Sequence, residues 1–404
     1  MPPSVELPRW LQAAHSPEHL TSVVTALTNR ERLRASARTA SKHKSHSSKV
    51  HRASFGASSS LLTKSAHVNH YSVSVGNRPE NKTGNRYADI EPYDRTRVVI
   101  DEQLEMGSGA TSRKGRYLNA NWVRELAGGK WWIATQAPLP HTAHAFLSVI
   151  LQPTTRPPHD LLHPLESNSH PETDERPSRV RTVVQLTQNF ESGHQKAHVY
   201  FPPLPGQSWV MYPEPGCTAP PIKVTLISTK TIDEAQSLQS TVSIIPVGVP
   251  ADQEPIIFQH MLFGAWPDHG VPEGEDKLAL LRFTKWVDTV NKDLSLQPSH
   301  SGVDLDPDPP IMVNCSAGIG RTGAFIACSS LLRYFGFLGG PARESREFHP
   351  VNPSPLGPLP SDIADDIVAQ EIDSLREQRP GMVQRPEQIL LVYELVEGAL
   401  SGVQ

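Results

Sequence analysis

The stretch Ile311-Met-Val-Asn-Cys315-Ser-Ala-Gly-Ile-Gly-Arg321-Thr-Gly-Ala-Phe325 is the most informative part of the sequence. An apolar run typical of a buried strand ends at Cys315, mostly small residues follow, and Arg321 opens a helical pattern. Gly318 and Gly320 let the backbone curl, so that successive amide groups point inward at the start of the helix. Such a nest binds a tetrahedral anion and lowers the pKa of a neighbouring cysteine. We therefore predict that Cys315 attacks a phosphorus atom held by this loop and by the Arg321 guanidinium.

Composition excludes several classes of protein. The 404 residues include 38 prolines, about twice ordinary usage, so we expect many loops. No apolar run reaches the length of a membrane-spanning helix, and the first residues lack the pattern of a secretory signal. The three cysteines, Cys217, Cys315 and Cys328, show neither a disulfide framework nor metal-ligand spacing. A cytoplasmic location is therefore predicted, with a nuclear one as a further option.

Charge divides the chain into a basic arm and an acidic body. Residues 1–80 contain 11 Lys and Arg against 4 Asp and Glu, although the whole chain has a net charge of −4. Apolar residues at helical spacing predict a helical segment within residues 1–34, starting near Ser16. Residues 35–77 are rich in Ser, His, Lys and Arg and are predicted to be a disordered linker. We interpret the arm as a solvated tail, with docking to an acidic partner as the alternative, and expect no nucleic-acid binding.

Residues 78–404 have the sequence pattern of a folded domain with three insertions. Short buried strands are predicted at residues 181–187 and 310–314, and amphipathic helices at residues 277–290 and 363–376. Strands and helices mixed in this way predict an α/β (α+β) fold, a twisted mixed β-sheet flanked by helices. Three proline-rich insertions are predicted to be surface loops, near residues 152–179, 202–221 and 341–360.

The run from Cys315 to Gly323 resembles the phosphate-binding loop of the protein tyrosine phosphatases, of the phosphotyrosine-specific type. The resemblance continues from about residue 81 to residue 400 and implies the cysteine-dependent phosphatase fold. It implies that the backbone of the loop binds phosphate and that Thr322 hydrogen-bonds the departing thiolate. The phosphate-binding positions carried over are Ser316, Ala317, Gly318, Ile319 and Gly320. No metal or cofactor is expected, because the loop itself neutralises the phosphate charge.

Trp266-Pro-Asp268-His-Gly-Val-Pro272 is similar to the mobile acid loop of the same family. The chemistry asks for such a residue, because a phenolate leaves poorly unless it is protonated as the P–O bond breaks. A carboxyl group on a movable loop can give that proton and later activate water. Asp268 is therefore assigned both roles.

Asn85-Arg-Tyr87-Ala-Asp89 resembles the loop that recognises phosphotyrosine. The resemblance implies that Tyr87 walls a deep cleft and stacks on the substrate ring, and that Asp89 holds the substrate backbone. A deep cleft favours phosphotyrosine because the phosphoserine side chain is too short to reach the nucleophile. Gly84 stands where the family usually has Lys.

Four further positions are carried over from the family, and a fifth departs from it. Gln384 and Gln388 resemble the glutamine loop that positions the hydrolytic water, and an amide orients water without competing as a base. Glu191 and Lys196 match a loop in which the Glu orients the phosphate-binding Arg. Asn314 stands where the family usually has His just before the nucleophile, so the environment of the Cys315 thiolate is expected to differ.

The resemblance implies a protein tyrosine phosphatase that acts on phosphotyrosine-containing proteins through a phosphocysteine on Cys315. Two alternatives stay open at this point. Asn314 allows a catalytically impaired phosphotyrosine-binding module, although Cys315, Asp268 and Arg321 are all retained. A dual-specificity phosphatase is the other, although the motif around Tyr87 favours phosphotyrosine.

Overall fold

The computed structural model describes residues 7–44, 59–103, 114–153, 155–158, 161, 178–250, 253–297, 305–339, 348, 350–351 and 353–402. The α-helices are α1 (Arg9–Ala13), α2 (Pro17–Lys44), α3 (Ser59–His70), α4 (Pro79–Lys82), α5 (Ala143–Leu151), α7 (Gly274–Lys292), α8 (Gly320–Tyr334), α9 (Ile367–Gln378) and α10 (Pro386–Leu400). The strands are β1 (Arg97–Gln103), β2 (Lys114–Arg124), β3 (Trp131–Thr135), β4 (Thr182–Gln185), β5 (Phe190–Glu191), β6 (His194–Gln195), β7 (Ser208–Met211), β8 (Ile222–Ile232), β9 (Ser237–Pro246), β10 (Ile256–Phe263) and β11 (Ile311–Asn314). Short 3-10 turns lie at Pro140–Thr142, Asp233–Ala235 and Leu294–Leu296.

One mixed sheet forms the centre of the molecule. Its nine strands run in the order β1-β2-β3-β11-β4-β10-β9-β8-β7. Strand β11 is parallel to both neighbours, with Asn314 paired to Thr135 of β3 and to Gln185 of β4. A parallel strand covered on both faces is apolar throughout, and Ile311 to Val313 are fully buried. The mixed sheet predicted from the sequence is thus confirmed, and the residue after β11 lies at its middle.

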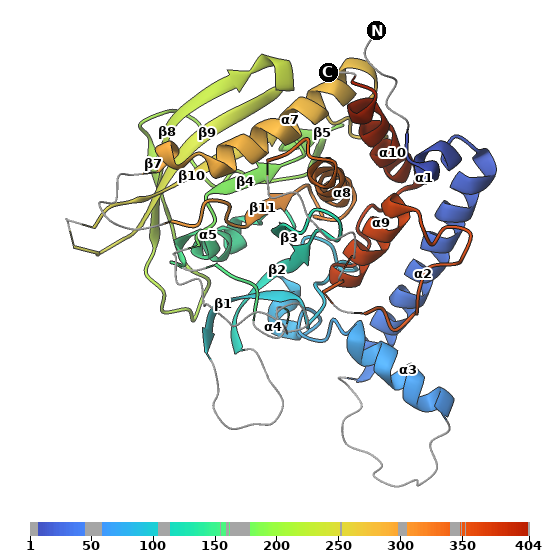
Figure 1. Cartoon of the computed structure of the whole chain (residues 1–404). Coiled ribbons are helices and arrows are strands. Elements are labelled where there is room, and N and C mark those ends of the chain that lie inside the picture. The colour runs from blue at the N-terminus through green and yellow to red at the C-terminus, as the bar shows by residue number, and fades with distance from the viewer. Residues whose placement is uncertain are drawn as a thin grey trace, which may run out of the picture.

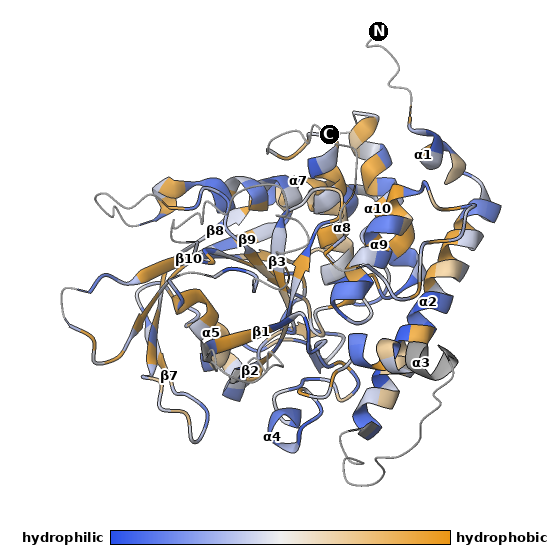
Figure 2. Cartoon of the chain, turned by 60° about the horizontal axis from the view of Figure 1, so that its bottom comes forward, coloured by the Kyte–Doolittle hydropathy of each residue, from blue (hydrophilic) through white to orange (hydrophobic). Residues whose placement is uncertain are grey.

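Helices cover both faces of the sheet (Figure 1). Helices α7, α8, α9 and α10 pack on one face and share one apolar core with it. Helix α5 packs on the other face with a second core, and its ribbon is largely hydrophobic in Figure 2. Helices α1 and α2 lie outside α9 and α10, and Val23 and Leu27 of α2 belong to the first core.

The predicted central elements are confirmed with small changes at their ends. The strands expected at residues 181–187 and 310–314 are β4 and β11, and the helix expected at residues 277–290 is α7. The helix expected at residues 363–376 is α9, which begins later, at Ile367. Asp366 caps it by accepting a hydrogen bond of 2.9 Å from the Ala369 amide, so the first turn starts after that residue.

The disordered linker expected over residues 35–77 is wrong for the described residues. Helix α2 continues to Lys44, α3 occupies Ser59–His70, and Tyr71 and Val73 are fully buried. Helix α2 is mostly hydrophilic (Figure 2), and the apolar spacing that predicts a helix is confined to its first half. Tertiary ion pairs stabilise it instead, which a local sequence pattern does not reveal.

The basic charge of the arm is paired within the molecule. Arg30 donates to the Asp373 carboxylate from Nε at 2.9 Å and from Nη2 at 2.8 Å. Arg34 contacts Asp373 at 2.6 Å and Glu377 at 2.6 Å, and Lys42 lies 2.6 Å from Glu91. The interpretation as a solvated tail is therefore wrong for α2, and docking of a partner through these side chains is not supported. The rest of the basic run, residues 45–58, lies outside the described residues.

The insertion predicted at residues 202–221 is only partly a loop. It contains β7, which pairs antiparallel with β8 from Ser208↔Thr225 to Met211↔Ile222. The strand lies at the edge of the sheet, where flanking prolines are tolerated and hide its pattern. Most of the insertion at 152–179 and part of that at 341–360 lie outside the described residues.

Replacement of Arg34 by Met is expected to lower the free energy of unfolding by about 3 kcal/mol, because it removes a fully buried cation that the buried carboxylates of Asp373 and Glu377 share. Urea denaturation followed by circular dichroism measures this loss. Arg32→Met on the same helix is the control: Arg32 is exposed and donates a hydrogen bond of 3.2 Å to its helix neighbour Asn29, so a change within about 0.5 kcal/mol is expected. Equal losses in the two variants would contradict a stabilising role for the ion-pair cluster.

Candidate active site

The loop after β11 forms the floor of the site. Cys315 follows the strand directly, is 6% exposed, and is joined by a short loop to Gly320, the first residue of α8. Gly318 has a φ of 71°, and a Cβ atom there would lie 2.0 Å from the carbonyl oxygen of Thr135 on β3. Only glycine fits this position. The loop is therefore pressed against the sheet, and the free amide groups at the start of α8 face the cleft.

The surroundings of Cys315 favour its thiolate. The Gly318 amide donates to Sγ at 3.3 Å. Burial raises the pKa of the thiol, but the Thr322 side chain, the Arg321 charge and the backbone amides of Thr322 and Ile319 outweigh it, so the pKa lies below its ordinary value. Cys328 on α8 shows the contrast, because burial without such partners raises its pKa to about 12. The nucleophile predicted from the sequence thus has the electrostatic setting that the role needs.

Arg321 is held in a fixed orientation at the edge of the loop. Glu191 accepts two hydrogen bonds from its guanidinium, at 2.7 and 2.8 Å. The carbonyls of Leu186 and Pro267 accept two more, at 3.1 and 2.9 Å. Glu191 is itself fixed, since Thr187 donates to it at 2.7 Å. This bidentate pairing pre-organises a planar fork that suits two oxygens of a phosphate.

Asp268 lies on the loop after β10, with Lys196 beside it. Lys196 Nζ lies 2.8 Å from Asp268 Oδ1, and Arg321 Nη2 lies 4.0 Å from the same oxygen. Hydrogen bonds from Lys196 and then from Ser192 hold the pKa of Asp268 well below its usual range. The carboxyl group is therefore ionised when the cleft is empty.

Tyr87 forms one wall of the cleft. Its hydroxyl lies 2.7 Å from Ser316 Oγ, and Ser316 Oγ donates to the Lys196 carbonyl at 2.6 Å. Asn85 anchors the Tyr87 loop to the sheet, because its Oδ1 accepts from Tyr117 at 2.6 Å. These contacts tie the wall to the phosphate-binding loop, so the distance from rim to floor is set by the fold.

The structure brings nearly all of the predicted residues into one cleft of about 330 Å³. Those that line it are Tyr87, Asp89, Glu191, Lys196, Asp268, Cys315, Ser316, Ala317, Ile319, Gly320, Arg321, Gln384 and Gln388. Gly318 in the loop, Asn314 at the end of β11 and Thr322 on α8 are buried. Asn314 donates from Nδ2 to the Cys315 carbonyl at 3.1 Å, so it supports the backbone of the loop.

The sequence did not predict two groups of residues at the site: four that line the cleft and one that holds the loop at its floor. Thr187, Ile90, Gly270 and Arg385 line the cleft without belonging to any of the predicted site positions. Arg379, after the last turn of α9, is fully buried and donates to the carbonyls of Gly318 at 2.7 Å and Ala317 at 3.0 Å. Burial lowers its pKa to about 10. Because its partners on the loop are backbone oxygens, no residue pattern in the sequence identifies them.

Within the described part of the chain, no group of three or more His, Cys, Asp or Glu side chains is placed to hold a metal ion. None of the helices in the described ranges has the length and apolar character to cross a membrane.

Known proteins resemble this chain over most of its length. A family model described as protein-tyrosine phosphatase matches residues 81–157 and 177–336. Tyrosine-protein phosphatase non-receptor type 18 of Mus musculus is 26% identical over 330 residues, which are 82% of this chain and 54% of that protein. Receptor-type tyrosine-protein phosphatase H of Homo sapiens is 30% identical over 285 residues, 69% of this chain and 20% of that protein. The chain thus spans about half, or less, of the curated relatives it matches.

A solved structure supports the fold. The crystal structure of the catalytic domain of human protein tyrosine phosphatase non-receptor type 18 aligns with a TM-score of 0.51. The alignment covers 81% of this chain and 88% of that one, at 23% sequence identity. This likeness establishes the arrangement of helices and strands.

Alkylation by iodoacetamide tests the electrostatics of the floor. Cys315 is expected to react with a pH midpoint below that of a free cysteine, about 8.5, because the loop stabilises its thiolate. The rate is followed by mass spectrometry of the Cys315 peptide between pH 5 and pH 9. Thr322→Val is expected to raise the midpoint, since Thr322 is the largest of the groups that lower the pKa. A midpoint at the free-cysteine value in the wild-type protein would contradict the arrangement.

Proposed function

Because the chain belongs to the protein-tyrosine phosphatase family, we propose that it hydrolyses phosphotyrosine on proteins through a phosphocysteine intermediate. One observation carries the proposal: a single cleft joins a cysteine of lowered pKa, a clamped arginine and an ionisable acid on a separate loop. These are the nucleophile, the anion site and the proton donor that cleavage of an aryl phosphate requires.

In the first step the Cys315 thiolate attacks phosphorus. The Arg321 fork and the loop amides bind the equatorial oxygens, whose charge they stabilise in the transition state. The Cys315 Sγ–P bond forms and the P–O bond to the tyrosine ring breaks. Asp268 gives its proton to the leaving phenolic oxygen. The phosphate dianion beside Asp268 raises the pKa of this carboxyl group from its low value in the empty cleft, because two like charges oppose ionisation.

In the second step water attacks the phosphocysteine. Asp268 now takes a proton from the water, since it was left ionised by the first step. Gln384 lines the cleft and supplies an amide that orients this water without competing as a base. Thr322 and the Gly318 amide stabilise the departing thiolate. The products are phosphate and the enzyme in its original state.

The wall of the cleft supports a preference for phosphotyrosine. Tyr87 contacts the phosphate-binding loop at Ser316 and offers a ring for stacking. Asp89 lies exposed at the rim, where it can accept hydrogen bonds from the substrate backbone. A phosphoserine, which lacks the ring, is too short to span this depth. We propose phosphotyrosine-containing proteins as the partners. A cytoplasmic or nuclear location stays a prediction from the cysteine pattern.

The test compares turnover of a phosphotyrosine peptide by the wild-type chain, Cys315→Ser and Asp268→Ala. Cys315→Ser is expected to abolish phosphate release, because no nucleophile remains. Asp268→Ala is expected to lower kcat by roughly 10²- to 10⁴-fold, the usual contribution of a positioned acid. Phosphate release is measured by a colorimetric assay.

Three controls accompany this test. With p-nitrophenyl phosphate, whose leaving group needs less protonation, the Asp268→Ala defect is expected to shrink. A phosphoserine peptide of the same sequence is expected to release no phosphate, and activity is expected to survive a chelator. Binding of the phosphotyrosine peptide without turnover would instead identify an impaired binding module, and comparable hydrolysis of both peptides a dual-specificity enzyme.

A further inference from the structure

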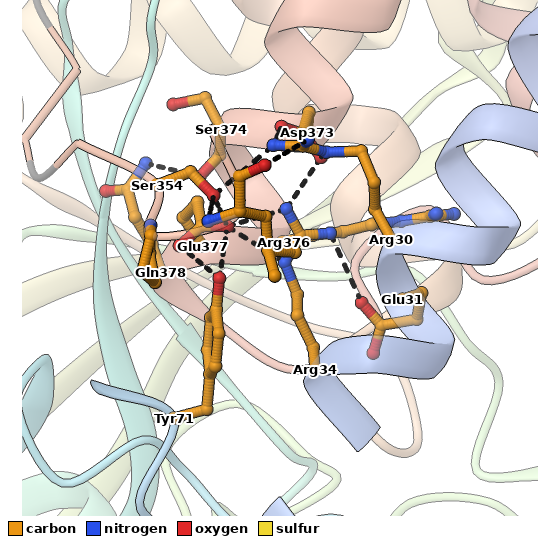
Figure 3. A network of polar contacts seen from close by, with 12 residues as sticks. Arg30, Glu31, Arg34, Tyr71, Ser354, Asp373, Ser374, Arg376, Glu377 and Gln378 are labelled. Carbon is orange, nitrogen blue, oxygen red and sulfur yellow. Dashed lines mark hydrogen bonds and ion pairs between the residues drawn. The ribbon is translucent and has the colours of Figure 1, made fainter. Parts of the chain in front are cut away.

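Arg376 on α9 connects the N-terminal arm to the backbone beside Gln384. Its side chain is 4% exposed and donates to three carbonyl oxygens. Nε donates to Met382 at 2.8 Å and Nη2 to Val383 at 2.6 Å. Nη1 donates to Leu27 of α2 at 2.9 Å. Figure 3 shows Arg376 among the charged side chains between the two helices.

The segment that Arg376 holds is under backbone constraint. Val383 has a φ of 52°, a region disfavoured for a β-branched residue. Its amide donates to the Ile319 carbonyl at 3.2 Å, and a Cβ atom on Gly323 of α8 would lie 2.3 Å from that amide nitrogen. The Val383 carbonyl belongs to the peptide group that precedes Gln384. The Arg376 guanidinium therefore fixes the orientation of this peptide group, and with it the direction from which the Gln384 side chain enters the cleft.

The arm in turn holds Arg376. Arg30 pairs with Asp373, and Arg34 pairs with both Asp373 and Glu377, on either side of Arg376 along α9 (Figure 3). All of these side chains are largely buried. The pairs fix α2 along α9, which brings the Leu27 carbonyl within reach of Arg376. The link thus runs from α2 through one guanidinium to the glutamine loop.

We propose that Arg376 is a positioning residue for the water-orienting Gln384, and that helix α2 holds Arg376 in the orientation this requires. The inference rests on the proposed function, because it concerns the second step of that reaction. None of the hydrogen bonds of Arg376 involves Cys315, Arg321 or Asp268. Its loss therefore slows hydrolysis of the phosphocysteine while attack on the substrate proceeds.

The kinetics of a two-step reaction separate these effects. The ratio kcat/KM reports steps up to formation of the phosphocysteine, whereas kcat also contains its hydrolysis. For Arg376→Lys we expect kcat to fall roughly tenfold, in keeping with the cost of a small misplacement, while kcat/KM stays within about twofold. Rapid mixing with p-nitrophenyl phosphate is expected to show a burst of p-nitrophenol near one equivalent per enzyme. Acid quench and intact-mass measurement then detect the accumulated phosphocysteine.

Arg181→Lys is the matched control. Arg181 is also 4% exposed and also donates to backbone carbonyls, those of Asn291 at 2.6 Å and Pro307 at 2.9 Å. A general loss of folded enzyme lowers kcat and kcat/KM by one factor and produces no burst, and this is the expected behaviour of Arg181→Lys. If Arg376→Lys behaves in the same way, the positioning role is wrong. Absence of turnover by the wild-type chain would instead overturn the proposed function itself.

A separate variant tests whether helix α2 contributes to the positioning of Arg376. Arg34→Lys keeps the charge but loses the fork that grips Asp373 and Glu377 together. We expect a smaller fall in kcat than in Arg376→Lys, again with kcat/KM retained and a partial burst. Unchanged kcat in a variant whose unfolding midpoint is lowered would show that α2 stabilises the fold without holding Arg376.

Discussion

The close contact between the loop after β11 and strand β3 is the constraint on which the site depends. Gly318 lies so near the Thr135 carbonyl that no side chain fits, and the loop is thereby pressed into the centre of the sheet. Arg379 holds the same loop from behind through the carbonyls of Ala317 and Gly318. With its carbonyls bound to the protein, the loop turns its amides toward the cleft. The lowered pKa of Cys315 follows from this orientation, which opposes the effect of burial.

Helix α9 joins this centre to the periphery. One face carries Asp373 and Glu377 toward α2, and its C-terminal end carries Arg376 and Arg379 toward the two loops of the site. Buried charges of this kind add little net stability over apolar packing, but each is costly to leave unpaired. They therefore specify one position of α2 on α9. The arm, basic in composition, is complementary to the acidic side chains it covers.

The sequence predicts the residues of the site more completely than it predicts the helices and strands around them. Cys315, Arg321 and Asp268 lie in short motifs whose chemistry is local, and the resemblance of those motifs to one family implies that they meet in one cleft, as they do. Helix α2 is held by ion pairs with residues distant in the sequence, such as Arg34 with Glu377 and Lys42 with Glu91. The strand β7 was hidden by neighbouring prolines, and Arg376 and Arg379 act on backbone oxygens. Neither a distant ion pair nor a backbone acceptor produces a local residue pattern from which it could be predicted.

Arg321 touches both halves of the catalytic machinery. Besides its pairing with Glu191, it donates to the carbonyls of Pro267 at 2.9 Å and Asp268 at 3.4 Å on the acid loop. The guanidinium that the proposed function assigns to the phosphate thus also holds the backbone of this loop. Thermodynamic linkage makes the effect reciprocal: an oxyanion that favours this position of the loop must bind more tightly when the loop occupies it, by the same factor. In the proposed reaction, substrate binding and placement of the proton donor are therefore one cooperative equilibrium that depends on a single side chain.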